Sequence, residues 1–245
     1  MIVDGHVHIG KSTRLQIDID GEGLVRIADS LGIDKLCCTD LTALFYDMHE
    51  GNRLLYAEMQ RFPDRILGYA SLHSTRFGSE ALDEIKRCRN DYGMHGLKIY
   101  STPEMSIAES AVIPILEICA ELKMPILAHT TPSECEYIMG HVPEVNFIMA
   151  HAGGQPFANG DWNRAIMVAQ RFPNLYLDTA CSTVDSSFVE ACVNTLGAER
   201  IIFGTDVPLL DPWPQMAKVA ETRLTKEQRD LVMGGNILRL MGVSA

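Results

Sequence analysis

The chain of 245 residues has the length of one large domain or two small ones, and its 47% hydrophobic and 22% charged residues are typical of a globular protein. Its 32 acidic and 21 basic residues give a formal net charge of −11, and such a surface repels the phosphates of nucleic acid. No apolar stretch is long enough to cross a bilayer, and no basic segment typical of a signal peptide precedes the first apolar run. We therefore predict a cytoplasmic protein that binds neither nucleic acid nor membrane.

The use of cysteine supports the same compartment. Seven cysteines, an odd number, lie mostly within apolar segments, and none belongs to a Cys-x-x-Cys pair. Reduced cysteines that serve as small buried hydrophobic residues show this distribution. We therefore expect neither a disulfide framework nor a zinc site made of cysteines.

The first predicted strand, 1–8, ends in two histidines spaced His-x-His. Because side chains alternate along a strand, His6 and His8 point to the same side. Two imidazoles on one side of a rigid strand can bind a divalent metal with little loss of conformational freedom. The Gly10-Lys11-Ser12 that follows resembles part of a phosphate-binding loop, but the earlier glycine would be Gly5, inside the strand, so we reject that interpretation.

Apolar strands and helices are predicted to alternate along the whole chain. Helical periodicity marks 22–31, 78–91 and 106–122, and Pro114 should lie in the first turn of the third helix or kink it. A capping box that begins at Thr225 predicts the start of the last helix. The seven further strands are predicted at 33–40, 65–73, 93–100, 124–130, 145–152, 175–181 and 200–207.

The number and character of these strands indicate the fold class. Strands that are apolar on both faces and alternate with helices form parallel sheets covered by helices. Eight such strands close a (β/α)₈ TIM barrel, whose usual size is about 250 residues. The alternative, an open doubly wound sheet, normally carries a glycine-rich phosphate loop after its first strand. We therefore predict an α/β protein in which residues 1–245 form a single TIM-barrel domain.

Several predicted strands end in residues that bind metals or transfer protons. His129 and His151 close the fifth and sixth strands, Asp206 closes the eighth, and Lys98 lies near the end of the fourth. In a TIM barrel these strand ends meet at the face that holds the active site. Imidazoles combined with a carboxylate suit Zn²⁺, and also Fe²⁺, Mn²⁺ or Ni²⁺.

With these residues the chain resembles the metal-dependent amidohydrolase superfamily, in particular the branch that includes aminocarboxymuconate-semialdehyde decarboxylase and several lactone hydrolases. The resemblance spans nearly the whole chain and includes the segments 96–100, 151–154, 204–208 and 235–240. It implies that His6, His8 and His129 are metal ligands and that Asp206 is a ligand or a proton shuttle. It also implies that His151 orients the attacking water or polarises the substrate, and in some members this histidine is itself a ligand.

Lys98 has two interpretations. In relatives with two metals, a lysine at this position is carboxylated and bridges the ions, whereas relatives with one metal have no such bridge. We favour one divalent ion per chain, with Zn²⁺ as the expected ion. Lys98 would then be a cation near a substrate carboxylate or a hydrogen-bond donor to Asp206.

Further residues are candidates for the mouth of the barrel. Tyr100 follows Lys98 on the same strand, and Arg14, in the loop after the first strand, can bind a substrate carboxylate. Weaker candidates for the same region are Cys181, Trp162, Trp213, Arg164 and Arg53. Packing or surface roles are expected for His49, His73, His95 and His141.

These residues support more than one function. The leading prediction is a metal-dependent hydrolase that attacks a small-molecule amide, lactone or ester through a metal-activated water. The alternative is a metal-dependent, non-oxidative decarboxylase of a small carboxylic acid on the same scaffold, because a fold does not specify a reaction. A TatD-like nuclease would carry a glutamate where this chain has Lys98, and a barrel that only binds a ligand would not need the full histidine and aspartate set. Short loops are compatible with a homo-oligomer in which a second subunit completes the site.

Overall fold

The computed structural model describes residues 1–73, 77–101, 105–153, 162–181 and 185–244. A nine-stranded sheet runs through them in the order β2-β1-β3-β4-β5-β6-β7-β8-β9. Strand β2 (Ile17–Ile19) pairs antiparallel with β1, and all other neighbours are parallel. The eight parallel strands are β1 (Val3–Ser12), β3 (Lys35–Asp40), β4 (Ile66–Ser71), β5 (Gly96–Tyr100), β6 (Ile126–His129), β7 (Phe147–Met149), β8 (Leu175–Asp178) and β9 (Ile201–Ile202).

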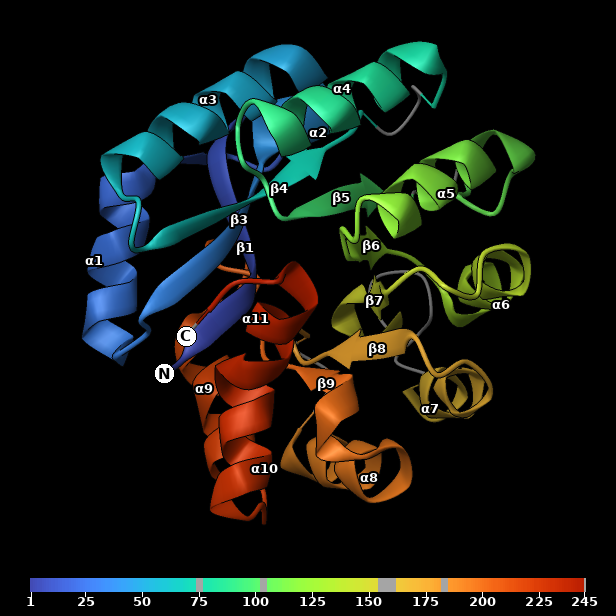
Figure 1. The fold of residues 1–245 in the computed structure, drawn as a ribbon. Coiled ribbons are helices and arrows are strands. Elements are labelled where there is room, and N and C mark those ends of the chain that lie inside the picture. Colours follow the sequence, from blue (N-terminus) through green and yellow to red (C-terminus); the bar gives the residue numbers. More distant parts are fainter. Residues whose placement is uncertain (74–76, 102–104, 154–161, 182–184, 245) are drawn as a thin grey trace.

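The residues after β9 close the sheet into a barrel. Val7 and Val207 form a parallel bridge, and Asp4 accepts hydrogen bonds from the backbone N–H and the hydroxyl of Thr205. Three backbone hydrogen bonds of 2.9 Å complete the seam, from Gly5 N to Phe203 O, from His8 N to Val207 O and from Asp206 N to His6 O. The first strand therefore pairs with the last, and the predicted TIM barrel is confirmed (Figure 1).

Helices surround the barrel in chain order (Figure 1). They are α1 (Gly21–Leu31), α2 (Leu41–Phe45), α3 (Met48–Arg61), α4 (Ser79–Asn90), α5 (Ile113–Glu121), α6 (Pro132–His141), α7 (Trp162–Arg171), α8 (Ser186–Leu196), α9 (Pro212–Ala220), α10 (Lys226–Asp230) and α11 (Asn236–Met241). Short 3₁₀ segments are η1 (Ser110–Val112), η2 (Ala150–Gly153) and η3 (Ala198–Arg200), and η4 (Leu231–Gly235) is a π-helical segment.

The helix signals in the sequence are largely confirmed. Pro114 lies in the first turn of α5, as Pro does where its missing N–H would have no intrahelical partner. Thr225 caps α10 in a capping box with Gln228. The expectation that this is the last helix is wrong, because η4 joins α10 to α11 through Gly234, whose backbone is not helical.

Alternation along the strands separates two parts of the core. One set of side chains packs outward against the helices, and the other points into the barrel. The inner set is closed at the N-terminal face by α11, which Figure 1 shows in front of the barrel opening. This inner cluster comprises Val3, Cys37, Leu67, Tyr69, Leu127, Ile148, Ala150, Tyr176 and Ile202 with Ile237, Leu238, Leu240 and Met241 of α11. Polar residues occupy the next inward positions, towards the strand ends.

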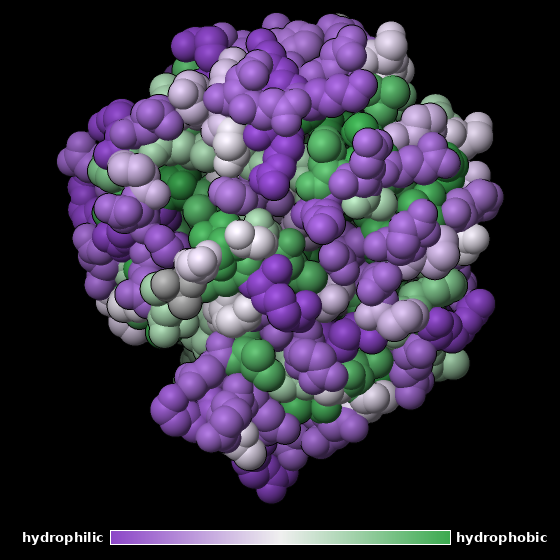
Figure 2. All heavy atoms as spheres, viewed as in Figure 1, coloured by the Kyte–Doolittle hydropathy of each residue, from purple (hydrophilic) through white to green (hydrophobic). Residues whose placement is uncertain are grey.

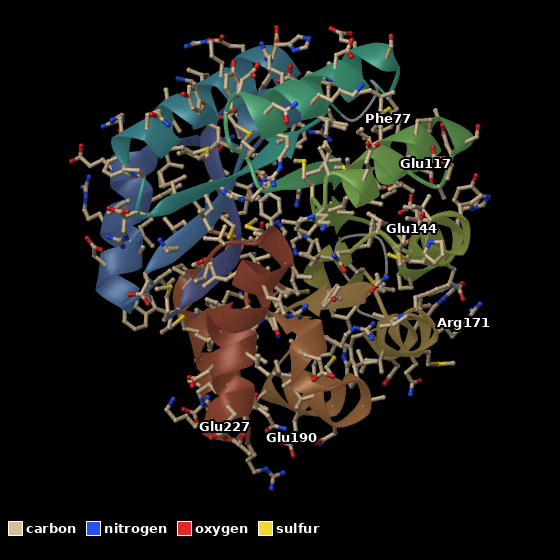
Figure 3. All side chains as sticks on the ribbon, viewed as in Figure 1. Phe77, Glu117, Glu144, Arg171, Glu190 and Glu227 are labelled. Carbon is tan, nitrogen blue, oxygen red and sulfur yellow. The ribbon has the colours of Figure 1, made fainter. Side chains whose placement is uncertain are left out.

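The outer surface is mainly hydrophilic. Figure 2 shows apolar atoms chiefly near the centre of the viewed face and between the outer helices. Figure 3 places Glu117, Arg171 and Glu190 on the outside of the helix ring, on α5, α7 and α8. All seven cysteines are buried. Among the helices described, none combines the length and the apolar character needed to span a membrane.

Candidate active site

Three predicted ligands meet where β1 pairs with the segment after β9. His6 and His8 point to the same side of β1, as predicted, and their Nε2 atoms lie 3.5 and 3.0 Å from Oδ1 of Asp206. All three residues are at least nine-tenths buried. Their ligand atoms lie within 4.8 Å of one another, a spacing that can hold one metal ion.

The chemistry of this group fits a bound cation. The Thr39 hydroxyl lies 3.3 Å from the carbonyl of Val7, so it donates there and accepts a hydrogen bond from Nδ1 of His8 at 2.8 Å. Nε2 of His8 then carries a lone pair that faces Oδ1 of Asp206, a buried atom that has no hydrogen-bond donor among the residues that the structure describes. Two buried acceptors this close are stabilised by a positive charge between them.

The other three imidazoles are held in the same tautomer. Nδ1 of His6 lies 2.8 Å from Oδ2 of Asp178, and Nδ1 of His129 lies 3.1 Å from the carbonyl of Ser101. Nδ1 of His151 contacts the carbonyl of Ala180. Since these partners only accept, each Nδ1 donates a hydrogen bond, and Nε2 is the ring nitrogen left to act as a metal ligand. Metal-binding histidines are commonly oriented in this way.

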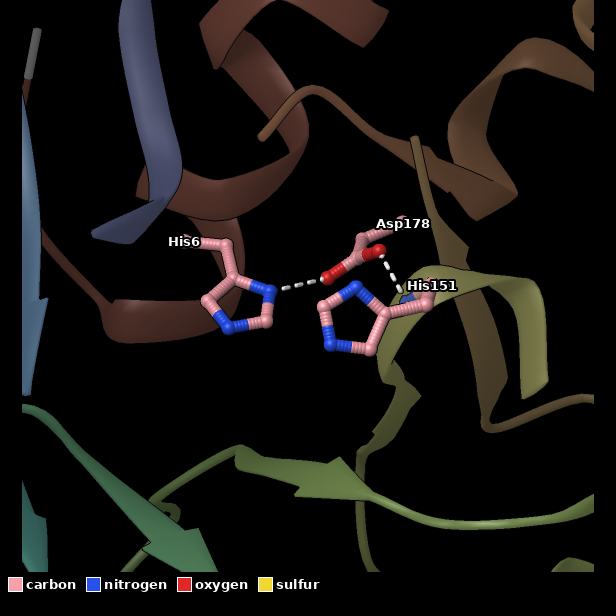
Figure 4. A group of neighbouring side chains, drawn as sticks. All are labelled: His6, His151 and Asp178. Atoms are coloured by element: carbon pink, nitrogen blue, oxygen red, sulfur yellow. Dashed lines mark hydrogen bonds and ion pairs between the residues drawn. The ribbon is translucent and has the colours of Figure 1, made fainter. Parts of the chain in front are cut away.

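Asp178 was missed by the sequence analysis, although its signal was the same as that of the predicted residues. It ends the apolar run of β8, and it is fully buried. Its Oδ2 binds the ring of His6, and its Oδ1 accepts the backbone N–H of His151 at 2.6 Å (Figure 4). Oδ1 also accepts the backbone N–H of Ala180 at 3.1 Å. Burial raises the pKa of this carboxyl, and the hydrogen bonds and nearby cationic groups oppose that shift. Asp178 therefore links the histidines of β1 and η2.

The backbone beside Asp178 is anchored from an outer helix. Lys218 of α9 is mostly buried, and its Nζ donates to the carbonyls of Thr179, at 2.9 Å, and Cys181. These carbonyls flank Ala180, which accepts from His151. The arrangement holds the end of β8 next to the histidine cluster. Cys181 contributes to it through its backbone carbonyl, which accepts from Lys218.

Four imidazoles form a continuous group across the barrel. Ring centroids are 5.2 Å apart for His8 and His6, 5.0 Å for His6 and His151, and 5.1 Å for His151 and His129. Burial, and then the neighbouring His151 and Lys98, lower the pKa of His129 to about 3. Burial also lowers the pKa of His6 and of His8. His6, His8 and His129 are thus neutral imidazoles, the form in which histidine binds metals.

Asp206 is the anionic member of the cluster. Burial raises the pKa of its carboxyl, but a hydrogen bond from His8 and the positive charge of His6 and His151, which these imidazoles supply when protonated, outweigh burial and hold that pKa well below its usual range. Asp206 and His151 also adopt left-handed backbone conformations, with φ of 62° and 58°. This conformation is uncommon for residues other than glycine, and such residues cluster at functional sites.

Gly204 makes room for this geometry. A Cβ atom at this position would lie 2.8 Å from Cβ of His6, closer than packed carbon atoms approach. The glycine of the Gly204-Thr205-Asp206 segment therefore lets β1 and the segment after β9 approach each other.

Lys98 lies inside the barrel and is 1% exposed. One interpretation of the sequence expected a hydrogen bond from Lys98 to Asp206. Its Nζ instead contacts a histidine, at 2.9 Å from Nε2 of His6. Burial lowers the pKa of Lys98 to about 8, and the charges of Asp206 and Asp178 limit the decrease. The amine is therefore mainly protonated at neutral pH.

Tyr100 and Arg14 lie at the side of this cluster. The ring of Tyr100 stacks on His129 at 4.3 Å, and Phe45 contacts Tyr100 edge-on at 5.6 Å. The guanidinium of Arg14 lies over Phe45, 5.6 Å from the ring centre. Burial raises the pKa of Tyr100, and the positive charge of Arg14 opposes this increase. Arg14 is exposed, which suits a residue at the mouth of the barrel.

The weaker candidates lie elsewhere. Arg53 forms two hydrogen bonds to Glu50 on the outer face of α3, so its proposed contact with substrate is wrong. Trp162 packs on Phe188 of α8, and Trp213 is 61% exposed on α9. Arg164, on α7, is 3.6 Å from Glu136.

The family model described as Amidohydrolase matches residues 47–243, which is most of the chain. The chain belongs to the amidohydrolase family. The resemblance seen in the sequence is thereby confirmed, and the protein is an enzyme. Among curated proteins there is no match.

Solved structures share the fold over almost the whole length of this amidohydrolase. 2,6-Dihydroxybenzoate decarboxylase from Rhizobium is 17% identical, with a TM-score of 0.80 and 98% of each chain covered. 4-Oxalomesaconate hydratase from Rhodopseudomonas palustris is 17% identical, with a TM-score of 0.75 and coverage of 99% of this chain and 96% of the other. Dihydroxybenzoic acid decarboxylase from Polaromonas, solved with bound manganese and the inhibitor 2-nitroresorcinol, is 16% identical, with a TM-score of 0.77 and coverage of 98% and 97%. Membership of this family, together with the cluster of buried histidines and aspartate, supports metal dependence.

Proposed function

We propose that this amidohydrolase is a metal-dependent lyase that releases CO₂ from a small, planar carboxylic acid. The observation that carries the proposal is the pair of cations beside the histidine and aspartate cluster. Lys98 lies within the cluster and Arg14 at its side, in a protein whose net charge is −11. Cationic side chains recognise carboxylates, and the rings of Tyr100 and Phe45 offer flat surfaces against which a conjugated acid can pack.

Decarboxylation was the alternative to hydrolysis in the sequence analysis. A chemical argument and the similar structures now favour it. A decarboxylase always has a carboxylate to bind, whereas an amide or a lactone needs no cation of this kind. The similar structures named above include two decarboxylases and a hydratase. At 16–17% identity these structures share the fold with this chain, and the choice of reaction is our proposal.

We assign the metal to His6, His8, His129 and Asp206. A bound divalent cation would supply a Lewis acid that polarises a substrate oxygen and lowers the pKa of water. Imidazole and carboxylate donors suit Zn²⁺, our expected ion, and also Mn²⁺. One ion per chain is sufficient for this donor set.

The protein's own residues would bind the acid and move the proton. Arg14 and Lys98 would hold the substrate's anionic groups, and His151, whose Nε2 is free to contact the substrate, would orient it. Asp206 is ionised and would accept a proton from water or a substrate hydroxyl, then pass it to the carbon that bears the carboxylate. That carbon gains hydrogen, its bond to the carboxylate breaks, the bonding electrons return to the conjugated system, and CO₂ leaves.

Composition also leads us to propose a cytoplasmic enzyme with a small-molecule substrate and no nucleic-acid or membrane partner. The acidic surface and the buried cysteines support this proposal. Assembly into a homo-oligomer remains a prediction from the short loops.

Substrate screening with two readouts tests the reaction. Protein loaded with Zn²⁺ or Mn²⁺ is incubated with hydroxybenzoates and muconate-type acids in one panel and with lactones and N-acyl compounds in the other. We expect CO₂ release from the first panel and no acid release from the second. Turnover confined to lactones or N-acyl compounds would establish the hydrolase and refute the lyase.

A further inference from the structure

Glu134 of α6 has an unusually complete set of hydrogen-bond donors. Its side chain is largely buried, with 8% of the residue exposed, and each carboxylate oxygen accepts three hydrogen bonds. Oε1 accepts from the Ser101 hydroxyl at 2.7 Å, the Ser106 hydroxyl at 2.6 Å and the Ile107 N–H at 3.1 Å. Oε2 accepts from the Thr130 hydroxyl at 2.9 Å, the Thr131 N–H at 3.0 Å and the Thr131 hydroxyl at 3.3 Å.

These donors lie on both sides of His129. Thr130 and Thr131 directly follow His129 at the end of β6. Ser101 follows β5, and its carbonyl accepts the Nδ1 hydrogen of His129 at 3.1 Å, while its own N–H donates to the His129 carbonyl at 2.8 Å. Glu134 therefore holds both the backbone that carries His129 and the residue that orients its ring.

We propose that Glu134 is a positioning residue that fixes the His129 imidazole for metal binding, acting through Ser101 and through the Thr130–Thr131 backbone. The inference rests on the proposed function, in which His129 is a metal ligand, and extends it to a residue that touches neither metal nor substrate. Groups that orient metal ligands typically change metal affinity or activity by about 10–100-fold when they are altered.

A second capping box in the chain shows what a glutamine at this position can still do. Glu134 closes a capping box with Thr131, and Gln228 closes the equivalent box with Thr225 at the start of α10. One amide oxygen is thus sufficient for the cap. It is not sufficient for six donors: with its oxygen at the cap, Glu134→Gln turns an NH₂ group towards Ser101, reverses the direction of that hydrogen bond and leaves the Ile107 N–H without its acceptor.

The test compares Glu134→Gln with a matched control, Gln228→Ala, which weakens the exposed capping box of α10. In metal-free protein labelled with ¹⁵N-histidine, we expect the Nδ1 hydrogen of His129 to exchange with solvent at least about tenfold faster in Glu134→Gln than in the parent. Competition with a chromophoric chelator should show Zn²⁺ and Mn²⁺ binding weakened by about 10–100-fold. Gln228→Ala should change neither quantity by more than about twofold.

A milder variant covers the case in which Glu134→Gln does not fold. Ser101→Ala retains the carbonyl that accepts from His129 and removes only the hydroxyl that donates to Glu134. It should change both quantities in the same direction, by at least about threefold. Unchanged hydrogen exchange and metal affinity in the folded variants, or equal changes in Gln228→Ala, would overturn the proposal. Parent protein that binds no metal would refute the proposed function, and hydrogen exchange alone would then decide the role of Glu134.

Discussion

Each imidazole of the cluster shows two different faces to its surroundings. The Nδ1 atoms of His6, His8, His129 and His151 contact oxygen atoms of the protein, and Nε2 of His6 and of His8 lies beside Asp206. The contact of Lys98 with Nε2 of His6 places a positive charge within the cluster. The site therefore favours ligands that accept electron pairs, such as a metal ion, together with an anionic substrate.

Asp206→Asn should lower kcat by at least about a hundredfold and leave KM within a few-fold, because general acid–base groups contribute about 10²–10⁴-fold. Asparagine keeps the shape of the side chain but cannot take up a proton at neutral pH. Metal content is measured on the same sample, and Asp211→Asn, at the exposed cap of α9, is the isosteric control. Turnover within a few-fold of the parent at full metal content would shift the proton transfer to His151.

Asp178→Asn should weaken metal binding by about 10–100-fold, although Asp178 lies behind His6. The carboxylate accepts hydrogen bonds from the His6 ring and from two backbone N–H groups, and an amide cannot accept all three. Chelator competition measures the affinity. Asp185→Asn, at the cap of α8, is the control because asparagine caps helices as well as aspartate does. Unchanged affinity would show that His6 does not need this partner.

Arg14→Gln should raise KM by about 10–100-fold with little change in kcat, since a hydrogen bond to a charged group contributes about 1.5–3 kcal/mol. Arg53→Gln is the matched control, because Arg53 pairs with Glu50 on α3. Steady-state kinetics on the best substrate of the screen give both constants. Equal effects in the two variants would remove Arg14 from the binding site.

At the scale of elements, an ion-pair cluster joins α3 to α4. His49 of α3 lies 2.9 Å from Glu80 and 2.5 Å from Glu84 of α4, and Arg87 contacts the same histidine. The hydrogen bond to Glu80 raises the pKa of His49. Partial burial opposes this increase, and the hydrogen bond to Glu84 adds to it. The protonated histidine thus favours the packed pair of helices.

The stability that His49 contributes should therefore depend on pH. Because its pKa is higher in the folded than in the unfolded chain, the contribution is complete below the unfolded pKa of about 6.5 and disappears as pH rises through the folded value. His49→Gln should lose at most about 1 kcal/mol of unfolding free energy near pH 6, because the pair is partly exposed. Urea unfolding of both proteins from pH 6 to 9 measures the difference, and a difference that grows with pH would contradict the assignment.

At the scale of the whole molecule, the proposed metal ligands connect the beginning, middle and end of the chain. His6 and His8 lie on β1, His129 on β6, and Asp206 after β9, where backbone hydrogen bonds close the barrel. An ion that binds only the folded barrel stabilises the entire structure by mass action.

Removal of the metal should lower the melting temperature. An ion at a hundred times its dissociation constant stabilises the folded state by about 2.7 kcal/mol, and each kcal/mol corresponds to roughly 2–4 °C for a chain of this size. Calorimetry before and after chelation, and after adding back Zn²⁺ or Mn²⁺, measures the shift. Elemental analysis should find about one ion per chain. Less than about a tenth of an equivalent, not restored by either ion, would refute the metal site.

Local patterns in the sequence were sufficient to predict the barrel and most residues of the histidine and aspartate cluster. Apolar strands that alternate with helices favour parallel pairing, and parallel strands bring their C-terminal ends to one face. His6, His8, His129, His151 and Asp206 could therefore be placed together without knowledge of any contact. The lengths of the strands were less accessible, because β1 continues to Ser12 through its pairing with β2.

Partners that bind across the barrel could be identified only in the tertiary structure. The carbonyl of Ser101 orients His129, and the carboxylate of Asp178 orients His6 across 172 positions of sequence. A backbone carbonyl has no signature in a sequence, and a strand-end aspartate does not reveal which ring it faces. These contacts depend on the register of the strands and on the closure of β1 against the segment after β9. Residue types at strand ends thus determined the chemistry that the site can hold, and the closed barrel decided how each side chain is oriented to perform it.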